Sequence, residues 1–204
     1  MLEKSKIVPI REQIADQLRS DIIAGELAPN EKLNEQALAS RFGVSRGPIR
    51  DVLLNLTKEG LLVTKNNCGA SVSGVLTPEM QKLMITLRHE MEFHAVEMLL
   101  ANDLLTEEDF AAMYETLDAM VEAFEADDFT GVTKIDIAFH SIFVKRAGGE
   151  ELLNLWQPII LRMRLNYARI TQTQEIVDEH RAIIEALKAK DFEAAKKALM
   201  INIR

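Results

Sequence analysis

The sequence predicts a mainly α-helical protein in two domains, a small N-terminal one with a β-hairpin and a larger all-α one. Over most of the 204 residues, apolar side chains recur at the three- and four-residue spacing of amphipathic helices. Aromatic residues make up only 5% of the chain, which contains nine glycines and five prolines. A β-sandwich or barrel, with its many strands and Gly- and Pro-rich turns, is disfavoured by this composition.

The charge distribution changes near residue 75. The formal net charge is −8, yet residues 1–75 hold ten Lys and Arg against nine Asp and Glu. The remaining residues hold fourteen basic against twenty-three acidic side chains. A nearly neutral module binds phosphates when its cations share one face. We therefore expect one domain over residues 1–75 and a second over residues 76–204.

Composition also excludes several classes of protein. A single cysteine, Cys68, rules out an intramolecular disulfide and argues against a Cys-ligated structural zinc site. The apolar runs are far shorter than the roughly 18 residues of a membrane span. The chain does not open with the basic and apolar leader of an exported protein. We expect a cytoplasmic protein that does not enter a membrane.

Three short helices are predicted before residue 60. The first has apolar residues at every fourth position, namely Ile10, Ile14, Leu18 and Ile22. Gly25 ends this helix, and residues 26–33 are typical of a turn. Asn34 begins a second helix that Gly43 ends, because Asn is a favoured N-cap and Gly a favoured terminator. Ser45 begins the third, whose apolar stripe is Ile49, Val52, Leu53 and Leu56.

A β-hairpin is predicted after the third helix. Residues 61–65 and 70–73 have strand-like composition, and the Asn- and Gly-rich stretch 66–69 between them is typical of a turn. Two helices joined by a glycine turn and followed by a hairpin form a winged helix-turn-helix, whose second helix enters the major groove of DNA. The N-terminal domain is therefore predicted to bind double-stranded DNA.

The candidate DNA contacts lie where the third helix begins. Arg46, Gly47 and Arg50 lie opposite its apolar stripe, and Arg bonds guanine O6 and N7 in pairs. Gly47 would let the backbone approach the duplex, and the Ser45 side chain is expected to bind the free amides of the first turn. Arg41, one element earlier, is expected to meet a phosphate. The alternative is a solvated helix face. The hypothesis would fail if these arginines were locked into intramolecular ion pairs.

The same apolar spacing predicts that the chain is helical from Thr77 to its end. Thr106 is a predicted cap before three acidic residues, and Gly148-Gly149 and Asp191 mark later joints. Helices are expected near residues 78–102, 107–126, 129–147, 150–170, 172–189 and 192–204.

Three polar residues in this region are candidates for a metal site. Asp136 and His140 are four residues apart, so they share a helical face with Phe139, and His180 lies within another apolar stripe. A buried polar group without a partner costs about 1–3 kcal/mol, so these groups need one another or a ligand. Two imidazoles and a carboxylate suit Zn²⁺, Ni²⁺, Mn²⁺ or Fe²⁺. A metal-free polar pocket is the alternative.

Residues 8–74 resemble the N-terminal domain of the GntR family of bacterial transcription regulators. The resemblance rests above all on "GVSRGPIRDVLLNL" and "EGLL". It implies a winged helix that binds a pseudo-palindromic operator as a dimer, with half-sites about 34–36 Å apart. Asn30 stands where the family usually has glycine, and Cys68 where the wing tip is often basic. The positions that match DNA contacts of the family are Arg41, Arg46, Arg50 and Gly69.

Residues 78–204 resemble the FCD effector domain of the FadR-type branch. There an Asp, the His four residues later and two further His hold a divalent metal, and Asp136, His140 and His180 match three of these positions. Asn202 stands at the fourth, where an amide is a weaker ligand than imidazole. Effectors of the family are small organic acids, so Arg88 is expected to bind a carboxylate. Three further effector-binding candidates, each with a solvated surface as its alternative, are Arg162, Arg164 and Asn166.

The predicted function is therefore a ligand-responsive transcription regulator that acts as a homodimer. A metal-dependent enzyme acting on a small carboxylate is one alternative, because Asp, His and His with an open metal position resemble a hydrolase site. The lack of a nucleophile or general-base motif argues against it. A metal sensor, in which the ion is the effector, is the other alternative, and Asn202 weakens it.

Overall fold

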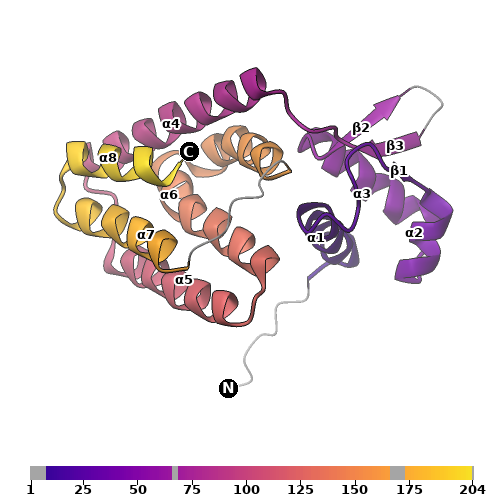
Figure 1. Cartoon of the computed structure of the whole chain (residues 1–204), viewed down its shortest axis with the longest axis horizontal. Helices are drawn as coiled ribbons and strands as arrows, with labels where there is room; N and C mark the ends of the chain where they lie inside the picture. Colours follow the sequence, from indigo (N-terminus) through magenta and orange to yellow (C-terminus); the bar gives the residue numbers. More distant parts are fainter. Residues whose placement is uncertain (1–7, 66–68, 166–172, 204) are drawn as a thin grey trace. The chain divides into compact units, whose positions relative to one another are not determined.

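The computed structural model describes residues 8–65, 69–165 and 173–203, and the chain divides into two compact units, Met1–Val75 and Leu76–Arg204 (Figure 1). Both units are built mainly from helices, as expected from the sequence. In the described part of the chain, no helix is both long enough and apolar enough to cross a membrane.

In its described residues, the N-terminal unit consists of three helices and a small antiparallel sheet. In chain order the elements are α1 (Ile10–Ile23), β1 (Lys32–Leu33), α2 (Glu35–Phe42), α3 (Arg46–Lys58), β2 (Leu62–Lys65) and β3 (Gly69–Val72). The strand order is β1-β3-β2, so the predicted hairpin is present and β1 adds a third strand to it. The unit's fully buried side chains include Leu18, Ile49, Leu56, Leu61 and Val72.

Strand β1 corrects the expectation of a simple turn over residues 26–33. Lys32 pairs with Ser71 and Leu33 with Ala70. The turn before it depends on Asn30, which has φ +68° and whose N–H donates to the Val72 carbonyl at 3.0 Å. Asn tolerates this left-handed conformation better than most residues, which explains how it replaces the usual glycine.

The two predicted caps of this unit behave differently. Asn34 accepts hydrogen bonds from the amides of Gln36 and Ala37 through its side chain, as expected. Ser45 occupies the N-cap position of α3 in an extended conformation, but its side chain makes no capping hydrogen bond. The expected role of the Ser45 side chain is therefore wrong.

The helices in the described residues of the C-terminal unit are α4 (Pro78–Ala101), α5 (Glu107–Glu125), α6 (Phe129–Arg164), α7 (Thr173–Lys188) and α8 (Phe192–Asn202). Helix α6 is two helical arms with a break at Gly148 and Gly149, where the sequence predicted a joint. Gly149 has φ +60° and ψ −154°, a conformation that is nearly restricted to glycine. The arms pack with α4, α5, α7 and α8 around a core that includes Leu99, Met113, Phe139, Phe143, Trp156 and Ile183.

Candidate functional site

The turn between α2 and α3 positions the start of α3. Gly43 ends α2 in the left-handed conformation, with φ +64°, and its N–H bonds back to the last turn of that helix. Helix α3 buries its four predicted apolar residues. Its opposite face exposes Arg46, Gly47 and Arg50, which is the face that the sequence predicted for DNA contact.

Both arginines of this face are bound to one carboxylate. Nη2 of Arg46 lies 2.9 Å and Nε of Arg50 lies 2.8 Å from Oε2 of Glu35. Hydrogen bonds from Arg50 and Arg46 lower the pKa of Glu35, which keeps it ionised. The two arginines are therefore ion-paired, because α2 begins beside α3. The arginine side chains remain 53% and 60% exposed, and such surface pairs contribute only about 0–1 kcal/mol, so they can exchange for other partners.

Arg41 faces α1 and contacts a buried acid. Its Nη1 lies 2.6 Å from Oδ2 of Asp21, whose side chain is 2% exposed, and its guanidinium lies over the Phe42 ring. A buried carboxylate needs a cationic or hydrogen-bonding partner. The structure therefore gives Arg41 a role in joining α2 to α1, while a phosphate contact stays a prediction.

A shallow recess separates α3 from the predicted wing. Gly69, at the start of β3, has φ +78° and, like Gly47, has open space where a Cβ would lie. Cys68 lies outside the described residues. The recess is lined by Glu35, Arg50, Leu53, Leu54, Thr64, Gly69 and Ala70.

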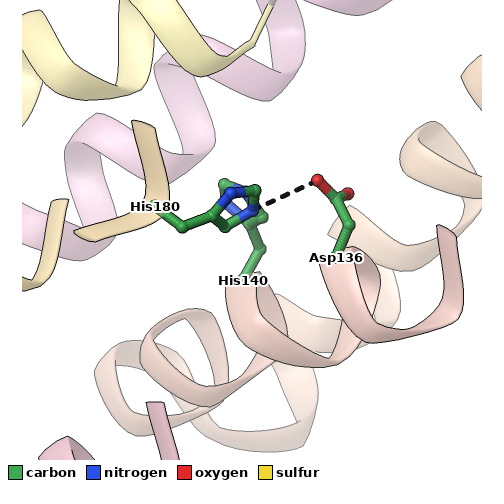
Figure 2. Close-up of side chains that lie close together, drawn as sticks. All are labelled: Asp136, His140 and His180. Atoms are coloured by element: carbon green, nitrogen blue, oxygen red, sulfur yellow. Dashed lines mark ion pairs between the residues drawn. The ribbon is translucent and has the colours of Figure 1, made fainter. Parts of the chain in front are cut away.

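The second site is a buried polar cluster in the C-terminal unit. Asp136 and His140 come from the first arm of α6 and His180 from α7, and one ligand atom of each lies within 4.8 Å of the others (Figure 2). Both histidines are fully buried, and Asp136 is 8% exposed. The structure thus brings together three of the four residues named as metal ligands.

Both histidines are oriented by hydrogen bonds at Nδ1. Nδ1 of His140 lies 2.7 Å from Oε2 of Glu92, and Nδ1 of His180 lies 2.7 Å from the Ile176 carbonyl. Because a carbonyl only accepts, His180 donates from Nδ1. The Nε2 atoms of both rings are buried and form no hydrogen bond within the described residues. In a neutral ring with a proton on Nδ1, Nε2 carries the lone pair that binds a metal.

Glu92 on α4 connects several of these side chains. It accepts hydrogen bonds from Nε of Arg88 at 2.7 Å and Nε1 of Trp156 at 2.8 Å, in addition to His140. Burial alone would raise the pKa of Glu92, but Arg88 and His140 outweigh it and lower the pKa to about 2. Sequence reasoning missed this residue. Glu92 follows Arg88 by four residues, so the two share a helical face, and this spacing is the feature that could have indicated it.

Asp136 is held by Arg164 and His180. Arg164, on the second arm of α6, forms a buried ion pair with Asp136, and Nε2 of His180 lies 3.3 Å from Oδ1. Burial opposes ionisation, but the charge of Arg164 outweighs it and holds the pKa of Asp136 well below its ordinary value. A solvated surface was one interpretation of Arg164, and its burial excludes that.

The remaining predicted residues differ in position. Arg88 is 2% exposed, and its Nη2 is buried without a hydrogen-bond partner among the described residues. Nδ2 of Asn202 lies 3.4 Å from Nδ1 of His180, so it contacts the ring nitrogen that bonds Ile176 rather than Nε2. Asn166 lies outside the described residues.

This donor set fits a divalent cation. Two Nε2 atoms without hydrogen bonds and a carboxylate are the ligands that Zn²⁺, Ni²⁺ and Mn²⁺ accept, and a carboxylate behind a ligating imidazole is a common supporting partner. Arg88 and Arg164 balance the charges of Glu92 and Asp136, so with neutral histidines these four charged groups have no net charge.

A helix-turn-helix with exposed arginines, followed by strands that match a wing, defines a class of protein: a DNA-binding transcription regulator. Comparison with known proteins agrees. Residues 10–72 match the family described as "Bacterial regulatory proteins, gntR family", and residues 83–204 match the "FCD domain". The chain therefore belongs to the GntR family, carries an FCD domain, and is a regulator and not an enzyme.

Relatives and solved structures cover nearly the whole chain. The "Uncharacterized HTH-type transcriptional regulator YdhC" of Bacillus subtilis (strain 168) is 30% identical, over 97% of this chain and 89% of the relative. The "Gluconate operon transcriptional repressor" of Bacillus licheniformis is 30% identical, over 93% of this chain and 80% of the relative. The solved structure of "E. coli McbR/YncC" has a TM-score of 0.81 at 25% identity. The match covers 97% of this chain and 94% of the solved chain.

Proposed function

We propose that this regulator binds a pseudo-palindromic operator as a homodimer in the cytoplasm, and that a small organic acid in the FCD domain controls its affinity for DNA. The observation that carries the proposal is the buried cluster of the C-terminal unit. Arg88 offers an unused donor there, and His140 and His180 offer Nε2 atoms without hydrogen bonds. Buried polar atoms without partners are rare in folded proteins, and a ligand would satisfy them.

Arg46 and Arg50 support the proposed contact with base edges in the major groove, and Gly47 and Gly69 support close approach of the backbone. Arg41 and Ser45 would contribute phosphate contacts. Helices that read DNA commonly place such residues in their first turns, as α3 does here.

An apolar stripe on α4 supports the homodimer. Met80, Leu83 and Leu87 are 40%, 47% and 40% exposed, and their spacing of three and four residues puts them on one helical face. A second copy of the chain would remove this face from water. Two α3 helices would then be presented to half-sites about one turn of DNA apart.

Charge balance supports an acid effector with a divalent metal. A cation held by Asp136, His140 and His180 would add two positive charges to a cluster that is otherwise balanced, and a carboxylate would offset part of this charge. A bound metal would supply a Lewis-acidic contact for that carboxylate, and Arg88 would bind the acid from α4. Binding by Arg88 and the histidines without metal is the alternative.

The test starts from selection of a preferred duplex out of a random-sequence pool with the full-length protein. Fluorescence anisotropy then measures affinity for that duplex against a permuted one. Gluconate, citrate and acetate are added to metal-stripped protein and to protein loaded with Zn²⁺, Ni²⁺ or Mn²⁺. We expect at least one acid to change duplex affinity by about tenfold, a coupling of about 1.4 kcal/mol. An effect of metal alone would indicate a metal sensor, and no selective duplex binding would contradict the proposal.

A further inference from the structure

Glu35 lies within the proposed DNA-binding face. It is the first residue of α2, where Asn34 caps the helix and the helix dipole favours a negative charge. Its side chain is 28% exposed and lines the same recess as Arg50 and Gly69. A carboxylate among groups that meet a polyanion repels phosphate, so its presence there calls for a physical explanation.

The bond to Arg50 leaves the base-reading edge of that guanidinium available. Arg50 donates from Nε to Glu35, and within the described residues its two terminal amino groups donate no hydrogen bond. Those two groups are the donors that suit guanine O6 and N7. A carboxylate bound at Nε fixes the plane of the guanidinium, which reduces the conformational entropy lost when it binds a base.

The same carboxylate reduces the charge offered to phosphates. With Glu35 ionised, the group Glu35, Arg46 and Arg50 carries one net positive charge instead of two. Binding to DNA of any sequence depends on neutralised phosphates, whereas base contacts depend on oriented donors. A phosphate that binds Arg46 would also have to displace the Glu35 carboxylate, so one ion pair would replace another with little net gain in binding free energy.

We propose that Glu35 is a specificity-determining residue. It orients Arg50 toward base edges and cancels part of the positive charge that Arg46 and Arg50 would otherwise present to non-specific DNA. This role rests on the sequence-selective DNA binding proposed above.

The test compares Glu35→Gln with Glu12→Gln in the full-length chain. Both variants remove one negative charge from the N-terminal unit, but Glu12 lies in the first turn of α1 and is exposed. Affinities for the selected duplex and for a permuted duplex of the same composition are measured by anisotropy over a range of KCl concentrations. Circular dichroism melting checks that each variant folds.

For Glu35→Gln we expect the permuted duplex to bind about three- to tenfold more tightly, and the slope of log K against log salt to steepen by about one. Affinity for the selected duplex should stay constant or fall, so the ratio of the two affinities falls about tenfold. The same ratio in both variants, or equal weakening on both duplexes, would overturn the role of Glu35. Failure of the wild-type chain to enrich any duplex would instead contradict the proposed function.

Discussion

Glu92 on α4 and His140 on α6 are separated by 48 residues in sequence, yet the Glu92 Oε2 and His140 Nδ1 atoms lie 2.7 Å apart and both side chains are fully buried. An ionised carboxylate only accepts hydrogen bonds, so a neutral His140 must carry its proton on Nδ1. The lone pair of Nε2 then lies on the side of the ring away from Glu92. The pair therefore prepares His140 to act as a ligand before any ligand is present.

Replacing Glu92 by Gln should weaken metal binding. An amide holds the Nδ1 proton less strongly, and loss of such a supporting carboxylate typically costs ten- to a hundredfold in metal affinity. Loss of the buried charge beside Arg88 should also lower the free energy of unfolding by about 3 kcal/mol. Zn²⁺ competition titration and thermal melting measure the two effects.

The direct test of the tautomer needs no metal. In ¹⁵N-edited NMR of the metal-free wild-type protein, the Nε2 resonance of His140 should have the shift of an unprotonated nitrogen. Glu90→Gln, an exposed change on the same helix, serves as control and should leave both the tautomer and the Zn²⁺ affinity unchanged. A protonated Nε2 in the wild-type protein would contradict this role of Glu92.

His140 should stay neutral in mildly acidic solution. Burial lowers its pKa, and Arg88 adds to this, although Glu92 opposes the shift. The unfolded chain therefore takes up a proton near pH 6.5, whereas the folded chain takes it up only at lower pH. The contribution of His140 to the free energy of unfolding is fully present above about pH 6.5 and decreases as the pH falls below it. Thermal melting of the metal-free protein between about pH 8 and 5 measures the decrease, and NMR titration of His140 tests its origin. A His140 midpoint above 6.5 would be the opposite result.

Arg46→Ala should weaken binding to the selected duplex by about 1–3 kcal/mol and relax sequence preference at one base position. Arg46 is the first residue of α3 and lies on its exposed face. Its surface ion pair with Glu35 is weak, so it can be exchanged for a contact with DNA. Arg11→Ala removes an exposed arginine from α1 as a control. Equal weakening on selected and permuted duplexes would mean that Arg46 binds phosphate and not a base.

Arg41→Ala should destabilise the N-terminal unit, because it removes the cationic partner of the buried Asp21. An uncompensated buried group costs about 1–3 kcal/mol, which thermal unfolding detects. The double change with Asp21→Asn should recover part of the loss, since no buried charge then remains. A stable single variant with greatly reduced affinity for every duplex would indicate a phosphate contact instead.

Local patterns were sufficient to predict most of the elements and part of each site. The capping residues and glycines of α2 and α3 lie at or next to the ends of these helices, so the local sequence indicates where each helix begins and ends. The spacing of Asp136 and His140 on one helix is likewise a local property. His180 followed from its apolar neighbours, because a polar residue in a buried stripe needs a partner wherever that partner comes from.

Contacts between distant segments could not be predicted in this way. Glu92 and Arg164 meet the histidine cluster only after α4 and the second arm of α6 have packed. The spacing of Glu92 from Arg88 indicates that pair, but no spacing in the sequence encodes the contacts with the cluster. The two residues of β1 are too few to show alternation, and the strand exists because β3 offers it a free edge. The ion pairs of Arg46 and Arg50 depend on where Glu35 lies after the turn at Gly43.

The break at Gly148 and Gly149 has a consequence for which changes in length this protein tolerates. Asp136 and Arg164 are 28 residues apart along α6, a distance of about 42 Å in an unbroken helix, yet they touch because the chain reverses. This ion pair requires each arm to be rotated about its own axis so that Asp136 and Arg164 face one another. One residue inserted between Gly149 and Arg164 would turn that guanidinium by about 100° about the helix axis. A whole turn inserted there would restore the rotation but move the guanidinium by about 5.4 Å along the axis. Related chains that keep this ion pair should therefore vary in length outside the segment between Asp136 and Arg164.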